Sequence, residues 1–158
     1  MGEVFIVDFE ERHLEDFKKL GYEWLSKYDL LEPVDEEMLN NPREKIIDKG
    51  GFVYIAEMDG ECVGTVSLGK IENGDFEILK LAVSDKYHGK RIGSLLMEKC
   101  FEKAWKEGAK KLLLYSNHQL KAALHLYKKY GFVNLEYDEN KYDVKGRYGK
   151  RTGRSFRS

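Results

Sequence analysis

The chain has 158 residues, with 27 Lys and Arg against 28 Asp and Glu, and a net charge of −1. This length predicts one domain around a single core, and an apolar content of 42% with 13% aromatic residues excludes a disordered chain. The near-neutral charge gives no whole-molecule attraction to nucleic acid or to a membrane surface. No apolar run approaches the roughly 18 residues that a membrane-spanning helix needs.

Targeting and redox signals favour the cytoplasm. Residues 1–13 are acidic and carry no signal-peptide pattern. Cys62 and Cys100 form no CxxC pair, so both are expected to be reduced thiols in the core. The sequence therefore predicts a cytoplasmic location.

The first third of the chain predicts one strand and two helices. Residues 3–9 alternate between apolar and polar side chains, as a half-buried strand does. Apolar residues recur at helical spacing over 13–28, where Gly21 weakens the helix by roughly 1 kcal/mol and allows a break. A second helix is predicted over 35–49, interrupted around Pro42 because proline removes a backbone donor.

A three-stranded meander follows. Residues 52–58 and 61–68 flank Asp59-Gly60, a strong signal for a two-residue hairpin turn. Residues 75–83 then form the third predicted strand.

The second half alternates helices and strands. A helix is predicted over 91–107 and ends at Gly108. Its apolar face is predicted to carry Ile92, Leu95, Leu96, Cys100, Ala104 and Trp105. A buried strand over 110–117, a helix over 120–130 and a strand over 132–137 complete the series. The order β-α-α-β-β-β-α-β-α-β predicts one mixed α/β domain over residues 1–140, with no linker that would divide it.

The most informative stretch is residues 77–93, where a strand-like run leads through a glycine-bearing loop into a helix. Such a loop leaves backbone N–H groups unpaired at the positive end of the helix dipole, so it suits an anion such as a pyrophosphate. Neither GxxxxGK[ST] nor GxGxxG fits, because the only glycines of the loop are Gly89 and Gly93.

Two motifs, one after the other along the chain, resemble the two signature motifs of the GNAT superfamily of N-acetyltransferases. The family's acetyl-CoA-binding motif, (Gln/Arg)-x-x-Gly-x-(Gly/Ala), falls on residues 88–93, HGKRIG, which follow the strand-like LAV at 81–83. About forty residues later, AALHLYKKYGF at 122–132 resembles the family's A-x-x-LY-x-x-x-GF signature. His88 replaces the usual Gln or Arg, and Arg91 replaces the first Gly.

The resemblance implies a mixed, mostly antiparallel sheet flanked by helices, and acetyl-CoA as the co-substrate. The residues that it places at the carrier are Leu81, Ala82 and Val83 along the pantetheine arm, His88, Gly89, Lys90, Arg91, Ile92 and Gly93 at the pyrophosphate, and Asn117 after the following strand. Asn117 also fits a turn residue or helix N-cap.

Arg91 leaves two alternatives. If its position needs a positive φ, the arginine is strained by roughly 1–2 kcal/mol. If the backbone there is already helical, Arg91 simply adds a cation. The second alternative is the prediction.

Two residues are candidates for proton transfer. Glu77 matches the family's strand glutamate that acts as general base, and simple alternation would place it on one face with Leu79, Leu81 and Val83. A solvated, idle glutamate is the alternative. Tyr127 matches the tyrosine that protonates the CoA thiolate in the family, although a core tyrosine would show the same pattern.

The carboxyl-terminal residues 141–158 carry seven Lys and Arg against one acid, Asp143. They predict at most a short polar strand followed by a flexible basic tail. A phosphate- or RNA-binding tail, an altered end and a loop near the acceptor site are three competing accounts. Losing a full last strand would expose a sheet edge, which favours either a homodimer or a modest stability.

The sequence therefore predicts an N-acetyltransferase that moves an acetyl group from acetyl-CoA to an amine of a small molecule or protein, by direct attack in a ternary complex. No metal is expected, because the histidines lack metal-ligand spacing. The alternative is a GNAT-like module that binds acyl-CoA or a partner without turnover.

Overall fold

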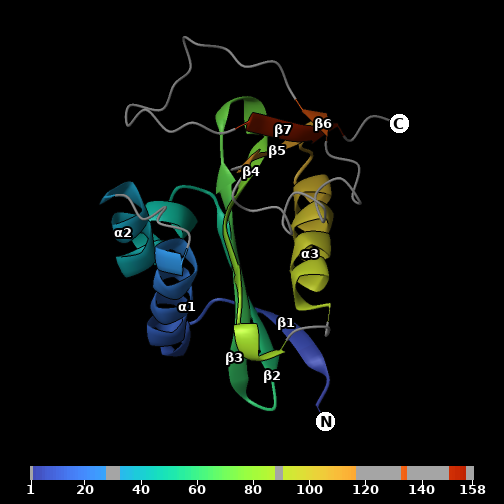
Figure 1. Ribbon diagram of the computed structural model, residues 1–158. Coiled ribbons are helices and arrows are strands. Elements are labelled where there is room, and N and C mark those ends of the chain that lie inside the picture. Colours follow the sequence, from blue (N-terminus) through green and yellow to red (C-terminus); the bar gives the residue numbers. More distant parts are fainter. Residues whose placement is uncertain (1, 28–32, 88–90, 117–132, 135–149, 156–158) are drawn as a thin grey trace.

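The computed structural model describes residues 2–27, 33–87, 91–116, 133–134 and 150–155. Within these residues one seven-stranded sheet has the order β1-β2-β3-β4-β5-β7-β6. Figure 1 shows the sheet between two helical layers, with α1 and α2 on one face and α3 on the other. The predicted mixed α/β fold is confirmed.

The strands are β1 (Val4–Asp8), β2 (Phe52–Met58), β3 (Glu61–Lys70), β4 (Phe76–Val83), β5 (Lys111–Ser116), β6 (Val133–Asn134) and β7 (Lys150–Ser155). The helices are α1 (Leu14–Lys27), α2 (Pro33–Asn40) and α3 (Ile92–Lys106). Strands β1 to β4 are antiparallel, β4 and β5 are parallel, and β7 runs antiparallel to both β5 and β6. The predicted helix over 120–130 lies outside the described residues.

The hairpin turn and the helix end form as predicted. Asp59 and Gly60 both have positive φ, 54° and 78°, as the two central residues of a type I′ hairpin turn require. Gly108, which follows the C-cap residue Glu107 of α3, has a φ of 79°. The second predicted helix divides at Pro42 into α2 and a short π-helical turn, Arg43–Ile47.

Helix α1 passes through Gly21 without a break. A β-carbon on Gly21 would meet a Cδ atom of Leu39, so the missing side chain lets α2 pack directly on α1. Leu39 and Phe17 are fully buried in the resulting core between these helices and the sheet. The glycine therefore serves helix packing and does not end the helix.

The other core lies between α3 and the sheet. The stripe Ile92, Leu96, Cys100 and Ala104 is buried there, as predicted. Trp105 is 60% exposed, so its predicted place on this face is wrong. It follows Ala104 directly and is rotated off the buried i, i+4 stripe by one residue.

Part of the predicted basic tail is a strand. Residues Lys150–Ser155 form β7, which pairs along all six residues of β5 and separates β5 from β6. The sequence KRTGRS has no apolar alternation that would announce a strand. The pairing comes from backbone hydrogen bonds along β5, so this part differs from the predicted flexible tail and covers the sheet edge at β5.

Candidate active site

A glycine in β3 lets the first turn of α3 lie directly on the sheet. A β-carbon on Gly64 would be 2.8 Å from Cγ2 of Ile92 and 3.1 Å from Cδ1 of Leu96. Gly64 pairs with Val83, the last residue of β4. The N-terminus of α3 is therefore held beside the carboxyl end of β4.

Arg91, the N-cap of α3, has left-handed backbone angles of φ 57° and ψ 26°. The prediction of a helical φ is wrong. The Arg91 carbonyl accepts the first hydrogen bond of the helix, from the Leu95 N–H at 3.0 Å, as the carbonyl of an N-cap residue does. An L-residue in this region is disfavoured by roughly 1–2 kcal/mol, which explains why the GNAT pattern has glycine at this position.

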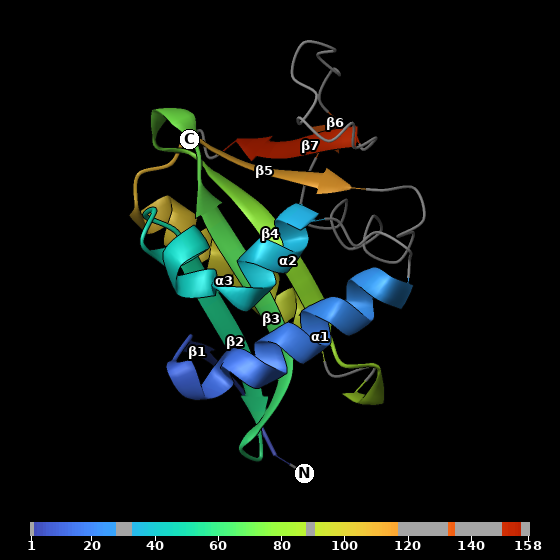
Figure 2. The same cartoon turned by 90° about the vertical axis from the view of Figure 1, so that its left-hand side faces the viewer.

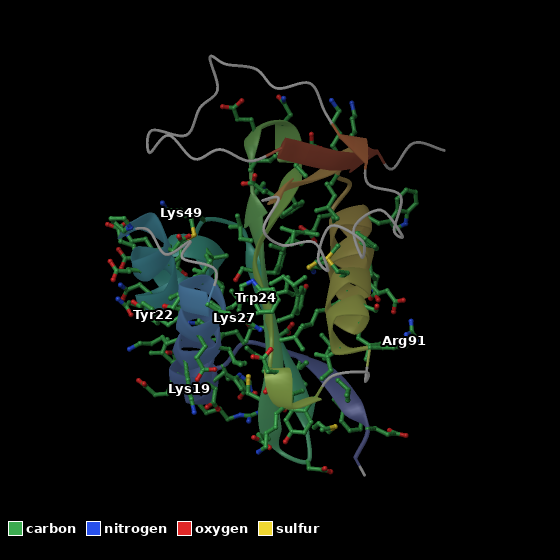
Figure 3. The ribbon with its side chains drawn as sticks, in the orientation of Figure 1. Lys19, Tyr22, Trp24, Lys27, Lys49 and Arg91 are labelled. Atoms are coloured by element: carbon green, nitrogen blue, oxygen red, sulfur yellow. The ribbon has the colours of Figure 1, made fainter. Side chains whose placement is uncertain are left out.

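The start of α3 keeps the features of an anion site. The Arg91 side chain caps no amide, and the first turn carries no acidic residue. The Arg91 guanidinium lies on the surface beside the helix start, 3.5 Å from Oε1 of Glu98 (Figure 3). The described part of the predicted pyrophosphate loop therefore offers amide groups and one nearby cation.

Strands β4 and β5 separate after three paired residues. Phe76, Glu77 and Ile78 pair with Leu112, Leu113 and Leu114 of β5. Strand β4 then continues to Val83 with no further β5 partner in its register, while β5 stays paired with β7 (Figure 2). Over Leu79–Val83 the β5-facing edge of β4 thus meets no paired strand among the described residues.

This open edge leads from the start of α3 to the point of separation. An extended arm with amide groups can add along such an edge as an extra strand. The predicted pantetheine contacts Leu81, Ala82 and Val83 all lie on it. Their role as contacts stays a prediction.

A β-bulge interrupts β4 at the same place. Thr65 pairs with Ala82 but Ser67 pairs with Leu79, so Val66 alone faces two residues of β4. One extra residue reverses the alternation of side chains beyond it.

Because of the bulge, Glu77 shares its face of the sheet with fewer of the residues predicted to be its neighbours. Ile78, Leu81 and Val83 all pack toward α3. Glu77 and Leu79 face the opposite layer of α1 and α2, so the predicted shared face holds for Leu79 and is wrong for Leu81 and Val83. The sequence analysis assumed that side chains alternate regularly between the two faces along β4, and one inserted residue breaks this alternation.

Glu77 lies next to the separation of β4 from β5. It pairs with Gly69 on β3 and with Leu113 on β5, one residue before the last β4–β5 pair. Its side chain is partly exposed, while Oε2 is buried. Cδ1 of Leu79 lies 2.8 Å from where a β-carbon would be on Gly69, the residue of β3 that pairs with Glu77.

The carboxyl end of α1 reaches the turn that follows β4. Helix α1 contacts both β3 and β4. Lys27 Nζ lies 3.4 Å from Oδ1 of Asp85, in the turn between β4 and α3. Trp24 lies on the side of α1 that faces the sheet (Figure 3).

Neither cysteine provides a reactive thiolate. Burial raises the pKa of the Cys62 thiol to about 12, and burial also raises the pKa of the Cys100 thiol. The thiolate is the nucleophilic form, so both groups are inert near neutral pH. An acyl-cysteine intermediate on this chain is disfavoured.

Other predicted site residues lie outside the described residues, namely His88, Gly89, Lys90, Asn117 and Tyr127. Their assignments stay predictions. In the described part of the chain, no group of three His, Cys, Asp or Glu side chains could hold a metal ion. No helix in those ranges is long and apolar enough to cross a membrane.

One buried polar residue of β3 was not singled out from the sequence. Ser67 is fully buried in β3, between the apolar residues Val66 and Leu68. A hydroxyl that alternates with apolar side chains in a buried strand was the available signal, because buried polar groups need a partner.

Comparison with known proteins agrees with this geometry. Residues 11–132 match the acetyltransferase (GNAT) family. An uncharacterized N-acetyltransferase of Schizosaccharomyces pombe is 30% identical over 78% of this chain and 78% of its own length. An uncharacterized N-acetyltransferase of Methanocaldococcus jannaschii is 32% identical over 56% of this chain and 42% of its own length.

Solved structures share the fold at low sequence identity. A GNAT-family acetyltransferase from Staphylococcus aureus superposes with a TM-score of 0.83 at 16% identity, covering 98% of this chain and 99% of its own. An N-acetyltransferase from Thermoplasma acidophilum, solved in complex with coenzyme A, gives a TM-score of 0.75 at 19% identity, covering 98% and 99%.

Proposed function

Because this chain belongs to the acetyltransferase (GNAT) family, we propose that it transfers an acetyl group from acetyl-CoA to a primary amine of a small molecule or protein. The observation that carries the proposal is the separation of β4 from β5 directly beside the start of α3. This arrangement offers an anion site and an open strand edge in one continuous line.

Several described residues are proposed to hold the carrier. The amides at the start of α3, including those of Ile92 and Gly93, would hold the pyrophosphate, with Arg91 as a nearby cation. The backbone of Leu81 and Val83 would bond the amides of the pantetheine arm. Acetyl-CoA supplies an activated acyl carbon as its thioester. The related Thermoplasma structure with coenzyme A supports this choice of carrier.

Glu77 is proposed to accept a proton from the acceptor. A lysine-type amine has a pKa near 10.4, so about one molecule in a few thousand is neutral at pH 7. A carboxylate at the point where β4 and β5 separate can take the excess proton, directly or through water. The buried Oε2 and the nearby Leu79 favour this role over that of an idle surface glutamate.

Transfer is proposed to be direct. The high pKa values of Cys62 and Cys100 argue against acylation of the enzyme, so the amine would attack in a ternary complex. Tyr127 is proposed, from the family signature, to protonate the departing thiolate.

The test is a screen for thiol release from acetyl-CoA with a panel of polyamines, aminoglycosides and peptides bearing free amines. Thiol release that requires both protein and amine supports the proposed transfer. Binding of acetyl-CoA without amine-dependent thiol release would support the alternative, a binding module without turnover.

A further inference from the structure

The start of β3 contacts the chain at both ends of the predicted pyrophosphate loop, residues 88–93. Before the loop, the Ser84 N–H donates a hydrogen bond to the Val63 carbonyl at 2.9 Å. At the other end, Ile92 lies against Gly64, on which a β-carbon would be 2.8 Å from Cγ2 of Ile92. Two consecutive residues of one strand therefore contact the segment that enters the loop and the segment that leads into α3.

A β-bulge in β3 makes this double contact possible. Ala56 and Glu57 of β2 are consecutive, but they pair with Gly64 and Cys62, so Val63 is an extra residue of β3. Val63 is buried in the core under α3, and the side of Gly64 that lacks a β-carbon also faces α3. Bulges aim side chains away from regular alternation in this way and are common beside functional sites.

Tyr87 ties the turn before the loop to the same end of β3. This turn, Asp85–Tyr87, ends directly before residue 88. The Tyr87 hydroxyl donates a hydrogen bond to Oε2 of Glu61, the first residue of β3, at 2.6 Å. So short a distance is typical of a hydroxyl bonded to a carboxylate, and such charge-assisted bonds are stronger than neutral ones. The bond to Glu61 raises the pKa of Tyr87, so the phenol stays protonated and remains the donor.

The contact between Tyr87 and Glu61 differs from an ordinary surface pair. The Tyr87 ring packs against the core between α3 and the sheet, so its position is restricted before the hydroxyl meets a partner. The other carboxylate oxygen of Glu61, Oε1, lies 3.9 Å from Nζ of Lys86 in the same turn. Less side-chain entropy is lost than when two free side chains meet, so the pair can hold the turn although the Glu61 side chain is 54% exposed.

We infer that Glu61 is a positioning residue for carrier binding, which acts through Tyr87 on the predicted pyrophosphate loop. The inference rests on the proposed function. Glu61 holds the chain that enters the loop, and the contact of Gly64 with Ile92 holds the start of α3. Both ends of the anion site are thereby placed by one strand before the carrier binds. Such preorganisation raises affinity, because less conformational freedom is lost on binding.

The test measures the affinity of wild type and Tyr87→Phe for acetyl-CoA and for free CoA by calorimetry. Phenylalanine keeps the ring and removes only the hydroxyl donor. If the binding-competent arrangement falls to roughly 10–30% of molecules, the apparent Kd for both ligands rises about 3- to 10-fold. In the thiol-release assay, the KM for acetyl-CoA should rise by the same factor, whereas kcat at saturation should stay within about twofold of wild type.

Variants of Glu61 separate positioning from the loss of a surface charge. Glu61→Gln keeps an oxygen that accepts from Tyr87, so acetyl-CoA affinity should stay within about twofold of wild type. Glu61→Ala removes the acceptor and should match Tyr87→Phe. The double variant Glu61→Ala with Tyr87→Phe should lose no more affinity than either single variant, because one hydrogen bond joins the two residues.

Tyr22→Phe is the matched control. The Tyr22 hydroxyl donates to Oδ1 of Asn40 at 3.2 Å, between α1 and α2. Tyr22 lies on the opposite side of the sheet from Arg91 (Figure 3). Its loss should leave acetyl-CoA affinity within about twofold of wild type. The melting temperature should change little in either tyrosine variant, since each loses one partly exposed hydrogen bond.

The outcomes separate the inference from the proposed function. Wild-type affinity in Tyr87→Phe would overturn the inference alone. Tighter binding in both single Glu61 variants would also overturn it, since Glu61 would then act only by repelling the carrier. An equal loss of affinity in Tyr22→Phe, or additive losses in the double variant, would do the same.

Failure of the proposed function gives different results. No binding of acetyl-CoA by wild type would overturn the proposed carrier and the inference together. Binding without amine-dependent thiol release would overturn only the proposed transfer, and the affinity of Tyr87→Phe would still decide the inference.

Discussion

Gly64 of β3 and Ile92 of α3 are in such close contact that a β-carbon on Gly64 would fall 2.8 Å from Cγ2 of Ile92. We therefore predict that Gly64→Ala displaces the first turn of α3 and weakens acetyl-CoA binding at least several-fold, as measured by calorimetry. The control is Gly21→Ala, which crowds Leu39 in the other core. It should lower the melting temperature and leave acetyl-CoA affinity nearly unchanged. Equal loss of affinity in both variants would contradict the specific role of Gly64.

Arg91 has a left-handed backbone that glycine adopts without strain. Arg91→Gly should raise the free energy of unfolding by about 1 kcal/mol, which corresponds to roughly 2–4 °C in melting temperature. The exposed pair with Glu98 contributes little that would offset this gain. Denaturant unfolding measures the effect. Arg91→Lys, which keeps a cation and a β-carbon, should show no such gain.

Glu77 should govern the acidic limb of the pH profile if it is the general base. Glu77→Gln keeps the side-chain size and removes the proton acceptor, so kcat/KM should fall at least about 100-fold. The fall in rate at low pH that reports the carboxylate should also disappear. A variant with near wild-type rates and an unchanged pH profile would assign the base to another group.

Tyr127 is the residue that the family signature assigns to thiolate protonation. Tyr127→Phe removes only the hydroxyl and should lower kcat 10-fold or more with little change in acetyl-CoA affinity. Steady-state thiol release measures kcat, and calorimetry measures the affinity for acetyl-CoA. Unchanged turnover would remove Tyr127 from the mechanism.

A charged cluster away from the site should make stability pH-dependent. Glu57 accepts hydrogen bonds from Arg12 at 2.8 Å and from Nε2 of His13 at 3.0 Å. Nδ1 of His13 accepts from the Glu10 amide, so Nε2 carries the donated proton. The hydrogen bond from Arg12, followed by that from His13, lowers the pKa of Glu57 below its usual 4.5.

A lowered folded-state pKa contributes stability above the unfolded value, and this stability is lost as pH falls through the folded value. Glu57→Gln should therefore be less stable than wild type at pH 6–7. The difference should shrink as pH falls below about 4.5, in denaturant unfolding followed across this range. A difference that stays constant with pH would exclude the Glu57 carboxylate as its source.

Local signals in the sequence predicted much of the fold. Asp59-Gly60 and Gly108 gave correct turn and helix-end positions, because positive φ depends on only a few neighbouring residues. Helix α3 was predicted correctly because its apolar stripe is also a pattern among residues that are near one another in sequence. The basic strand β7 was missed because its place depends on backbone pairing with β5, between Ser116↔Lys150 and Lys111↔Ser155, far away in sequence.

The site was predictable in outline and less so in detail. The loop motif placed the anion site at the start of α3, yet Arg91 was expected to be helical because an arginine gives no local sign of a reversed chain. Glu77 was assigned the wrong neighbours because a bulge is a property of two paired strands and one strand does not reveal it.

The measurement that tests the central claim most directly is calorimetric titration of the protein with acetyl-CoA and with free CoA. The account predicts micromolar binding of both ligands despite His88 and Arg91, and at least a several-fold loss of acetyl-CoA affinity in Gly64→Ala. No binding up to millimolar concentration would contradict a carrier site formed by the open edge of β4 and the start of α3.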